Sequence, residues 1–203
     1  MWPFILLTLV IGYLLGNLNG AVWVSHMLKD DVRAHGSGNA GLTNFIRSYG
    51  AHYALLVIAV DALKAVAACL IGGFLLKPYG MSFEGKALGG LAVMLGHIFP
   101  VFLGFHGGKG ILSGFFVALM LDWRIAILIL AVFALAYFAT GYVSLGSVLA
   151  SAAFGVGFAV FHCDNLTVLL CGIVMSLLAV FMHRQNIARL IKGEERKTDL
   201  FKK

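Results

Sequence analysis

Charge is scarce in this sequence. Only 12% of its 203 residues are charged, about half the share of ~25% that is usual in soluble proteins. Apolar residues make up 61% of the chain, and its mean hydropathy is +0.94. These values exclude a soluble domain of this length. A polar linker long enough to separate two domains is also missing, so we expect one domain over residues 1–203.

Ligands for a metal ion are missing as well. The three cysteines, Cys69, Cys163 and Cys171, do not have metal-ligand spacing, and two of them lie within apolar runs. No cluster of Asp, Glu, His or Cys has the spacing of a metal site. The net charge of +6 does not come with a run of basic and aromatic residues of the kind that binds nucleic acid. We therefore predict no metal, no cofactor and no nucleic-acid partner.

What the sequence does contain is long apolar runs separated by short polar segments. The runs cover residues 2–28, 53–76, 87–105, 110–121, 125–140, 142–161 and 166–182. The first has no basic start and no cleavage site, so we expect a spanning helix rather than a signal peptide. The fourth is shorter than the ~20 residues of a full span and is expected to be tilted, partly embedded or extended backward. The pattern predicts an all-α, polytopic transmembrane bundle with about seven spans.

An odd number of spans places the two termini on opposite faces, and the basic residues indicate which face is cytoplasmic. Eleven of the fifteen Lys and Arg residues fall on one side, against Lys77, Lys86 and Arg124 on the other. Cytoplasmic loops carry the excess of Lys and Arg. We therefore expect the N-terminus outside, the C-terminus inside, and residues 183–203 to form a mostly soluble, basic cytoplasmic tail.

The first candidate site is the polar segment HGSGNAGLTNFIR at residues 35–47, named the Gly-rich segment below. Gly36, Gly38 and Gly41 can adopt backbone angles closed to other residues and expose consecutive N–H groups, which bind anions. Arg47 adds a fork of donors that matches phosphate oxygens. The remaining polar side chains would complete the cradle: Ser37, Asn39, Thr43 and Asn44. An ordinary membrane loop, which also favours Gly, Ser and Asn, is the alternative.

A second glycine cluster at residues 107–110, the GGKG loop, is not a Walker motif. That motif requires Gly at position 103 and Ser or Thr at position 110, where this chain has Leu103 and Gly110. Flexible backbone donors beside Lys109 at the start of a helix still favour phosphate. A lysine that only obeys the positive-inside rule is the alternative.

Two more motifs, at residues 142–147 and 183–189, fall on the cytoplasmic side of the predicted topology. The first supplies the hydroxyls of Ser144 and Ser147. In the second, His183 and Asn186 are three residues apart on one helical face, where the last apolar run ends. Because all four motifs fall on one face, they predict a single cytoplasmic site.

Other polar residues have simpler interpretations. Asp61 and Lys64 are three residues apart in an apolar run and can form an ion pair, which fixes packing or contacts substrate. His97 is expected to orient structure rather than to catalyse. His26 and Asp31 have the His-x4-Asp spacing of soluble-type glycerolipid acyltransferases, but no companion motif is present, so we interpret the match as coincidence.

In this order the four motifs resemble those of the PlsY family, the bacterial acyl-phosphate:glycerol-3-phosphate acyltransferases. GSGNAGLTN at residues 36–44 is similar to the family's GSGNxGxTN, and GHIFPVFLGFHGGKG at residues 96–110 is similar to GHxFPxFxxFxGGKG. The resemblance implies a multi-pass inner-membrane enzyme of seven spans with a cytoplasmic site. It implies acyl transfer from acyl phosphate to the 1-hydroxyl of glycerol 3-phosphate, giving lysophosphatidic acid and phosphate without a metal, acyl-CoA or acyl carrier protein.

The resemblance also implies roles for individual residues. The catalytic set is Arg47, Lys109, Ser147, His183 and Asn186. The substrate- and phosphate-binding set is Ser37, Gly38, Asn39, Thr43, Asn44, Gly107, Gly108 and Ser144. The expected partners are the two substrates, the lipid bilayer and the upstream enzyme that forms acyl phosphate. This chain departs from the family at Ala65, where Gly is common, and at residues 111–113, where Ser113 still preserves a hydroxyl.

The chemistry of acyl transfer suits these residues. Acyl phosphate is already activated, so positioning can supply much of the rate and no enzyme nucleophile is required. Two bases for the acceptor hydroxyl are compatible with the sequence, His183 or a phosphate oxygen of the donor. A transporter or channel for an anionic solute is the main rival, although its polar residues would line a path at the midplane. An enzyme of the phosphatidyl-transfer type would need clustered aspartates for a metal, and the aspartates here are isolated.

Overall fold

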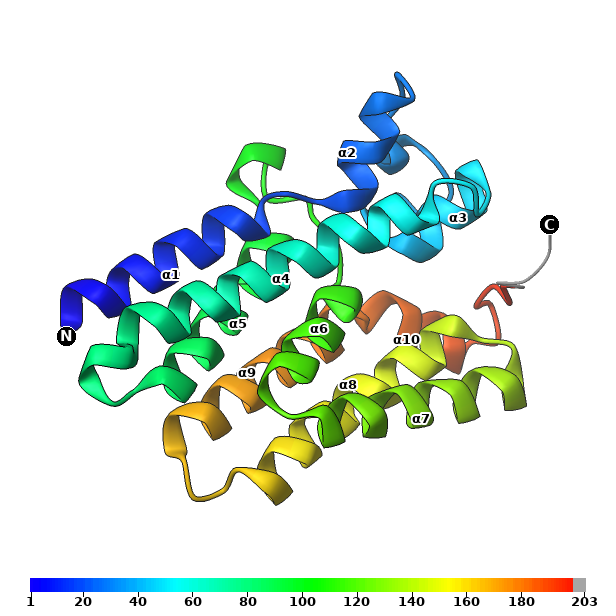
Figure 1. Ribbon diagram of the computed structural model, residues 1–203. Helices are drawn as coiled ribbons and strands as arrows, with labels where there is room; N and C mark the ends of the chain where they lie inside the picture. The colour runs from blue at the N-terminus through cyan, green and yellow to red at the C-terminus, as the bar shows by residue number, and fades with distance from the viewer. Residues whose placement is uncertain (199–203) are drawn as a thin grey trace. The chain divides into compact units, whose positions relative to one another are not determined.

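The computed structural model describes residues 1–198, which fold into helices and connecting turns without a strand (Figure 1). The chain divides into two compact units, Met1–Val117 and a second that begins at Ala118. Each unit is described by itself. The expectation of one domain over the whole chain stays a prediction.

The first unit contains three long helices that pack side by side (Figure 1): α1 (Trp2–Gly16), α4 (Ala54–Leu76) and α5 (Ser82–Ile98). Glycines line their contacts. A Cβ added at Gly16 would clash with the Val93 carbonyl, and one added at Gly72 would clash with the Gly85 carbonyl. Lipid tails are as apolar as leucine, so small residues that let backbones approach closely are what hold such helices together.

Five shorter elements complete the first unit. The helices α2 (Gly20–Met27) and α3 (Leu42–Tyr49), with η1 (Val32–Ala34) between them in the chain, precede α4, and both α2 and α3 contact it. The turns η2 (Lys77–Tyr79) and η3 (Val101–Leu103) follow α4 and α5. Val22, Phe45 and Val57, each no more than 3% exposed, form a small apolar core under α2 and α3. This core holds the Gly-rich segment against α4.

The first apolar run is not the single helix predicted for residues 2–28. It breaks between α1 and α2, where Asn19 begins α2 and accepts a hydrogen bond from the Val22 amide (3.1 Å). A helix interrupted within a membrane span leaves backbone groups that need partners. Lys64 and Asp61 of α4 supply those partners, because Lys64 donates to the Leu18 carbonyl (2.7 Å) and Asp61 accepts from the Gly20 amide (3.2 Å).

The second unit is built from α7 (Trp123–Thr140), α8 (Val143–Phe161) and α9 (Leu166–Met182), followed by α10 (Arg184–Ile191). Short turns join α7, α8 and α9, and consecutive helices pack against each other, so they run antiparallel (Figure 1). The start of α8 and the end of α9 therefore lie at the same end of the unit. The short helix α6 (Ile111–Leu121) crosses the boundary between the two units.

The helical, membrane-embedded class predicted from the sequence is confirmed. Within residues 1–198, five helical segments are long and apolar enough to span a membrane, and α9 with α10, bent by 52°, makes a sixth if the bent pair is one span. The remaining apolar run, α6, has only 11 residues. All seven runs are helices, while seven full spans and the orientation of the termini stay predictions.

Residues 183–198 of the tail are ordered, while its expected cytoplasmic location stays a prediction. Residues 184–191 form α10, and Thr198 is only 7% exposed. The Thr198 amide donates to the Gly141 carbonyl (3.2 Å), and the Tyr137 hydroxyl donates to the Thr198 carbonyl (3.1 Å). The chain therefore returns after α10 to the turn between α7 and α8. The last part of the predicted tail, residues 199–203, lies outside the described residues.

Candidate functional site

The Gly-rich segment forms a tight loop that leads into α3. Gly36 and Gly38 have left-handed φ values of 59° and 70°, which favour glycine, and the Gly38 amide donates to the His35 carbonyl (2.9 Å). Gly41 does not need this freedom, since its φ of −144° is open to any residue, so the expectation was wrong there. Ser37, Gly38 and Arg47 are exposed, and Asn39 and Thr43 are half-buried.

Asn44 is the residue that shapes this loop. Its side chain is buried, and its Nδ2 donates to the carbonyls of Val32 and His35, both at 3.0 Å. Its Oδ1 accepts a hydrogen bond from the Ser37 amide (2.9 Å). The Asn44 amide group thus serves the backbone of the loop itself, and its position in α3 determines where the exposed residues lie.

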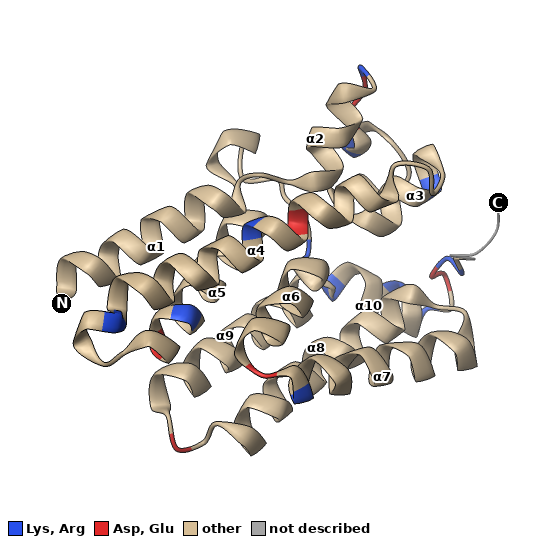
Figure 2. Cartoon of the chain, viewed as in Figure 1, with Lys and Arg blue, Asp and Glu red and all other residues tan. Residues whose placement is uncertain are grey.

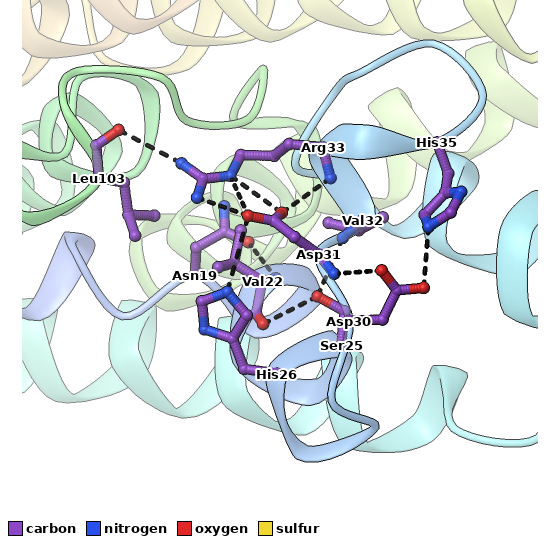
Figure 3. A network of polar contacts seen from close by, with 10 residues as sticks. All are labelled: Asn19, Val22, Ser25, His26, Asp30, Asp31, Val32, Arg33, His35 and Leu103. Atoms are coloured by element: carbon purple, nitrogen blue, oxygen red, sulfur yellow. Dashed lines mark hydrogen bonds and ion pairs between the residues drawn. The ribbon is translucent and has the colours of Figure 1, made fainter.

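A polar network precedes the Gly-rich segment (Figure 3). Arg33 holds Asp31 through two side-chain N–H groups, and the hydrogen bond from this guanidinium keeps the pKa of Asp31 well below its ordinary value. His35 bonds Asp30 (2.8 Å) and lowers the pKa of that carboxyl too. Arg33 also donates to the Leu103 carbonyl (3.4 Å), which ties the network to η3.

The same network shows what the two residues of the His-x4-Asp match do in the structure. His26 Nε2 lies 3.6 Å from Asp31, but the carboxylate of Asp31 is committed to the Arg33 guanidinium, with Oδ2 at 2.7 Å from Nη2. Asp31 also accepts from the Arg33 backbone amide and begins η1. The pair is therefore part of the network that builds the loop, which agrees with the interpretation of the motif as coincidence.

The GGKG loop lies against the Gly-rich segment. The Gly108 amide donates to the His97 carbonyl (3.1 Å). A Cβ at position 108 would clash with His97 Nε2 and would lie 2.7 Å from the Ala40 carbonyl of the Gly-rich segment. A Cβ at position 107 would clash with the His97 carbonyl. Glycine is thus needed for close approach, and the structure brings these two predicted motifs together, with Lys109 half-buried beside them.

The helix α4 carries one acidic and one basic residue in an otherwise uncharged stretch (Figure 2). Lys64 Nζ lies 2.7 Å from Asp61 Oδ1, and both side chains are at most 2% exposed. Lys64 also contacts His97 Nδ1 at 2.8 Å. All three residues are shielded from solvent and satisfied by protein groups. The interpretation that they organise structure agrees with this arrangement.

In the second unit, the predicted residues gather at the end where α8 begins and α9 ends. Ser144 and Ser147 lie in the first turns of α8, and both are buried. Ser147 Oγ donates to the Val143 carbonyl one turn back (2.9 Å). His183 joins α9 to α10, and Asn186 lies in the first turn of α10. The structure thus brings these four residues to one end of the second unit.

His183 is held in one tautomer. The ring is 3% exposed, and its Nδ1 lies 2.8 Å from the Ala179 carbonyl oxygen. A carbonyl oxygen only accepts hydrogen bonds, so Nδ1 carries the proton. In the neutral ring, the lone pair is then on the other nitrogen, Nε2.

Glu195 contacts a predicted site residue, and the sequence analysis missed it. It accepts a hydrogen bond from Asn186 Nδ2 (2.8 Å) and another from Arg189 Nε (2.6 Å). Burial acts to raise the pKa of Glu195, but the hydrogen bonds from Asn186 and Arg189 outweigh it, and the pKa is lowered. The tail thus returns a carboxylate to orient Asn186. The sequence contains no signal for this contact, because a spacing of nine residues from Asn186 does not match the period of a helix.

The polar side chains of the two first-unit loops suit phosphate better than a cation. Across residues 1–198 there is no group of three or more His, Cys, Asp or Glu residues that could hold a metal ion. The exposed and half-buried side chains of the two first-unit loops include the hydroxyls of Ser37 and Thr43, the Asn39 amide, Arg47 and Lys109. These groups donate hydrogen bonds to anions.

Comparison with known proteins agrees with this chemistry. The sequence pattern of the family described as Glycerol-3-phosphate acyltransferase matches residues 6–193. A glycerol-3-phosphate acyltransferase of Thermoanaerobacter pseudethanolicus is 39% identical over 195 residues, covering 96% of both chains. One from Neisseria meningitidis is 36% identical over 188 residues, covering 92% of this chain and 94% of the relative.

Solved structures resemble the chain over nearly its full length. A crystal structure of PlsY (YgiH), an integral membrane glycerol 3-phosphate acyltransferase in its glycerol 3-phosphate form, has a TM-score of 0.87 at 33% identity. It covers 98% of this chain and 99% of that one. The lysophosphatidic acid form has a TM-score of 0.82 at 34% identity, covering 97% and 96%. The resemblance stated from the motifs is confirmed, and the chain belongs to the glycerol-3-phosphate acyltransferase family.

Proposed function

We propose that this protein transfers an acyl chain from an acyl phosphate to the 1-hydroxyl of glycerol 3-phosphate, giving lysophosphatidic acid and inorganic phosphate. Membership of the acyltransferase family supports the reaction class. The observation that carries the proposal is the match to PlsY structures in a glycerol 3-phosphate form and a lysophosphatidic acid form. Those two molecules are the acceptor and the acylated product of this reaction.

The first unit is suited to bind phosphate. Gly36 and Gly38 turn the backbone so that Ser37 and Gly38 are exposed, and Arg47 is exposed in the following helix. The GGKG loop places Lys109 next to this segment. Both substrates carry a phosphate group, and the acyl phosphate releases one. Arg47 and Lys109 would bind these groups and stabilise the charge on the departing phosphate.

The second unit is suited to take up a proton. The 1-hydroxyl oxygen of glycerol 3-phosphate forms a bond to the acyl carbonyl carbon, and the bond from that carbon to the phosphate oxygen breaks. The phosphate leaves with the bonding electron pair, and the hydroxyl proton passes to His183 Nε2, the nitrogen that carries the lone pair. Asn186, Ser144 and Ser147 lie at the same end of the unit and would orient the acceptor.

The location follows from the distribution of charge. Eleven of the fifteen Lys and Arg residues fall on the side that the positive-inside rule assigns to the cytoplasm. All four motifs lie on this side of the predicted topology. We therefore place the enzyme in the bacterial inner membrane with its reaction on the cytoplasmic face, where an upstream enzyme that forms acyl phosphate would supply the donor.

A donor assay tests the proposal. Purified protein in detergent is incubated with glycerol 3-phosphate and either acyl phosphate or acyl-CoA, with and without EDTA, and both lysophosphatidic acid and phosphate are measured. We expect equal amounts of the two products from acyl phosphate alone, unchanged by EDTA. Product from acyl-CoA alone, or activity that returns only with a divalent ion, would contradict the proposal. Uptake of unmodified glycerol 3-phosphate into vesicles without acylation would support the transporter instead.

A further inference from the structure

Asp61, Lys64 and His97, the buried triad, connect the break in the first span to the GGKG loop. Lys64 Nζ makes three contacts of 2.7 to 2.8 Å, to Asp61 Oδ1, the Leu18 carbonyl and His97 Nδ1. A fourth, longer contact to the Gly16 carbonyl (3.4 Å) shares the three N–H donors of the ammonium group. The cation is fully used within the protein, and it is not placed to contact substrate.

These contacts determine the tautomer of His97. Because the ammonium of Lys64 can only donate, His97 Nδ1 is the acceptor and the ring proton is on Nε2. Nε2 lies on the side of the ring that faces Gly108, where an added Cβ would clash with it. The His97 carbonyl accepts the Gly108 amide (3.1 Å). One residue thus contacts the ion pair on one side and the GGKG loop on the other.

The Gly-rich segment is attached to the same place. Asn19, at the start of α2, donates from Nδ2 to the Ala40 carbonyl (3.0 Å), and Asp61 accepts from the next amide, that of Gly20 (3.2 Å). The Ala40 carbonyl also borders Gly108. Both loops that we assign to phosphate binding therefore take their position from the break in the first span, which the ion pair holds in place.

We propose that Asp61, Lys64 and His97 are positioning residues for substrate phosphate, which keep the Gly-rich segment and the GGKG loop in register. The inference rests on the proposed function, because it assumes that these loops bind phosphate-bearing substrates. If the inference is right, substitutions in the triad weaken substrate binding even in variants that remain folded. A triad that only held the helices together would affect unfolding and leave the affinity for substrate unchanged.

Two variants and one control test the triad. Lys64→Met alone would leave Asp61 buried and unpaired, so the first variant is Asp61→Asn with Lys64→Met, which removes both charges and keeps an acceptor for the Gly20 amide. The second, His97→Asn, keeps an acceptor near Lys64 and removes the part of the ring that contacts Gly108. The control is Thr8→Val, since Thr8 is also 2% exposed but bonds only the Phe4 carbonyl of its own helix (2.8 Å).

Each protein is purified in detergent, and four quantities are measured: thermal unfolding, KM for glycerol 3-phosphate, kcat, and calorimetric binding of glycerol 3-phosphate and inorganic phosphate. Displacement by about 1 Å can cost roughly 100-fold, so we expect both variants to raise KM and weaken binding by roughly 10- to 100-fold, with a smaller change in kcat. Thr8→Val should leave KM and the binding of both ligands unchanged, whatever its effect on the unfolding temperature.

Folded variants with wild-type KM and wild-type binding would overturn the positioning role. Failure of the proposed function gives a different result, the absence of turnover in the wild-type protein. In that case, calorimetric binding of inorganic phosphate tests the positioning role without turnover. Weaker binding by both variants than by the wild type would support that role. A wild-type protein that binds neither phosphate nor glycerol 3-phosphate would overturn both proposals.

Discussion

The polar residues of the two units are held in different ways. In the first unit they lie on loops whose shape comes from left-handed glycines, the Asn44 amide and close backbone contact at Gly108. In the second unit they lie at helix ends, where His183 bonds a carbonyl of its own helix and Glu195 orients Asn186. Exposed side chains on loops can donate several hydrogen bonds to one anion, whereas a helix end holds a single ring nitrogen in a defined direction. The difference matches the proposed division between phosphate binding and proton transfer.

The largest expected effect is the all-or-none labelling of cysteines from one side of the membrane. Native Cys163 is exposed, whereas Cys69 and Cys171 are buried, so an impermeant maleimide should label intact cells at Cys163. In a Cys163→Ser background, cysteines introduced at Ala34 in the first unit and Lys192 in the second, both exposed, should be labelled only after the cells are permeabilised. Thr198 is unsuitable because it is buried. Labelling of position 34 or 192 in intact cells would contradict a cytoplasmic location for that unit.

The next largest effect should come from Gly108→Ala in the first unit. The added methyl would clash with His97 and force the GGKG loop away from the Gly-rich segment. We expect kcat/KM to fall by roughly 100-fold, since small displacements of binding groups have effects of this size. Gly114→Ala is the control, because its Cβ would meet only Met94 Sδ at 3.9 Å. Equal activity of the two variants would mean that the loops do not need their close contact.

A smaller effect is expected in the second unit from Glu195→Gln. Glutamine keeps an acceptor for Asn186 but loses the charge that pairs with Arg189. A hydrogen bond to a charged group contributes roughly 1.5–3 kcal/mol, so the free energy of unfolding should fall by up to that amount. Chemical denaturation in detergent measures the loss. Glu194→Gln, at an exposed neighbouring position, is the control and should not change the free energy of unfolding. Equal losses in the two variants would mean that the contacts of Glu195 do not stabilise the fold.

The smallest effect is on the pH dependence of stability. The folded pKa of Glu195 lies below its ordinary value of 4.5, so its ionised form adds stability above that pH, and this contribution is lost as pH falls through the lowered folded pKa. Asp31 of the first unit behaves in the same direction from an ordinary value of 3.8. The difference in unfolding temperature between wild type and Glu195→Gln should therefore be constant near neutral pH and shrink on acidification below about 4.5. A difference that grows on acidification would contradict the lowered pKa.

The sequence predicted those features that depend on composition and local pattern. Apolar runs close to the length of a bilayer predicted the helices, and the glycine motifs predicted which loops hold polar groups. The break between α1 and α2 was not predicted in this way. Asn17, Asn19 and Gly20 interrupt the apolar run at that point, but the partners that the broken backbone requires come from α4. The helical class could therefore be predicted from each segment alone, whereas the break could not, because it depends on contacts with another helix.

The contacts that the sequence did not reveal join residues with no shared periodicity. Glu195 reaches Asn186 only because the chain reverses after α10, and Thr198 is buried only because it meets the turn at Gly141. Asn44 was recognised as a site residue, but its work within the loop depends on carbonyls nine and twelve residues earlier. Long-range contacts of this kind require the fold.

The central claim is the division of labour between the units, and one paired measurement tests it most directly. Glycerol 3-phosphate binding and kcat are measured for Lys109→Ala and His183→Gln. Loss of a charge-assisted bond of roughly 1.5–3 kcal/mol should weaken binding by at least ~10-fold in Lys109→Ala. His183→Gln should bind normally and lose roughly 100- to 10,000-fold in kcat. Normal binding by Lys109→Ala, or weakened binding with retained kcat in His183→Gln, would contradict the account.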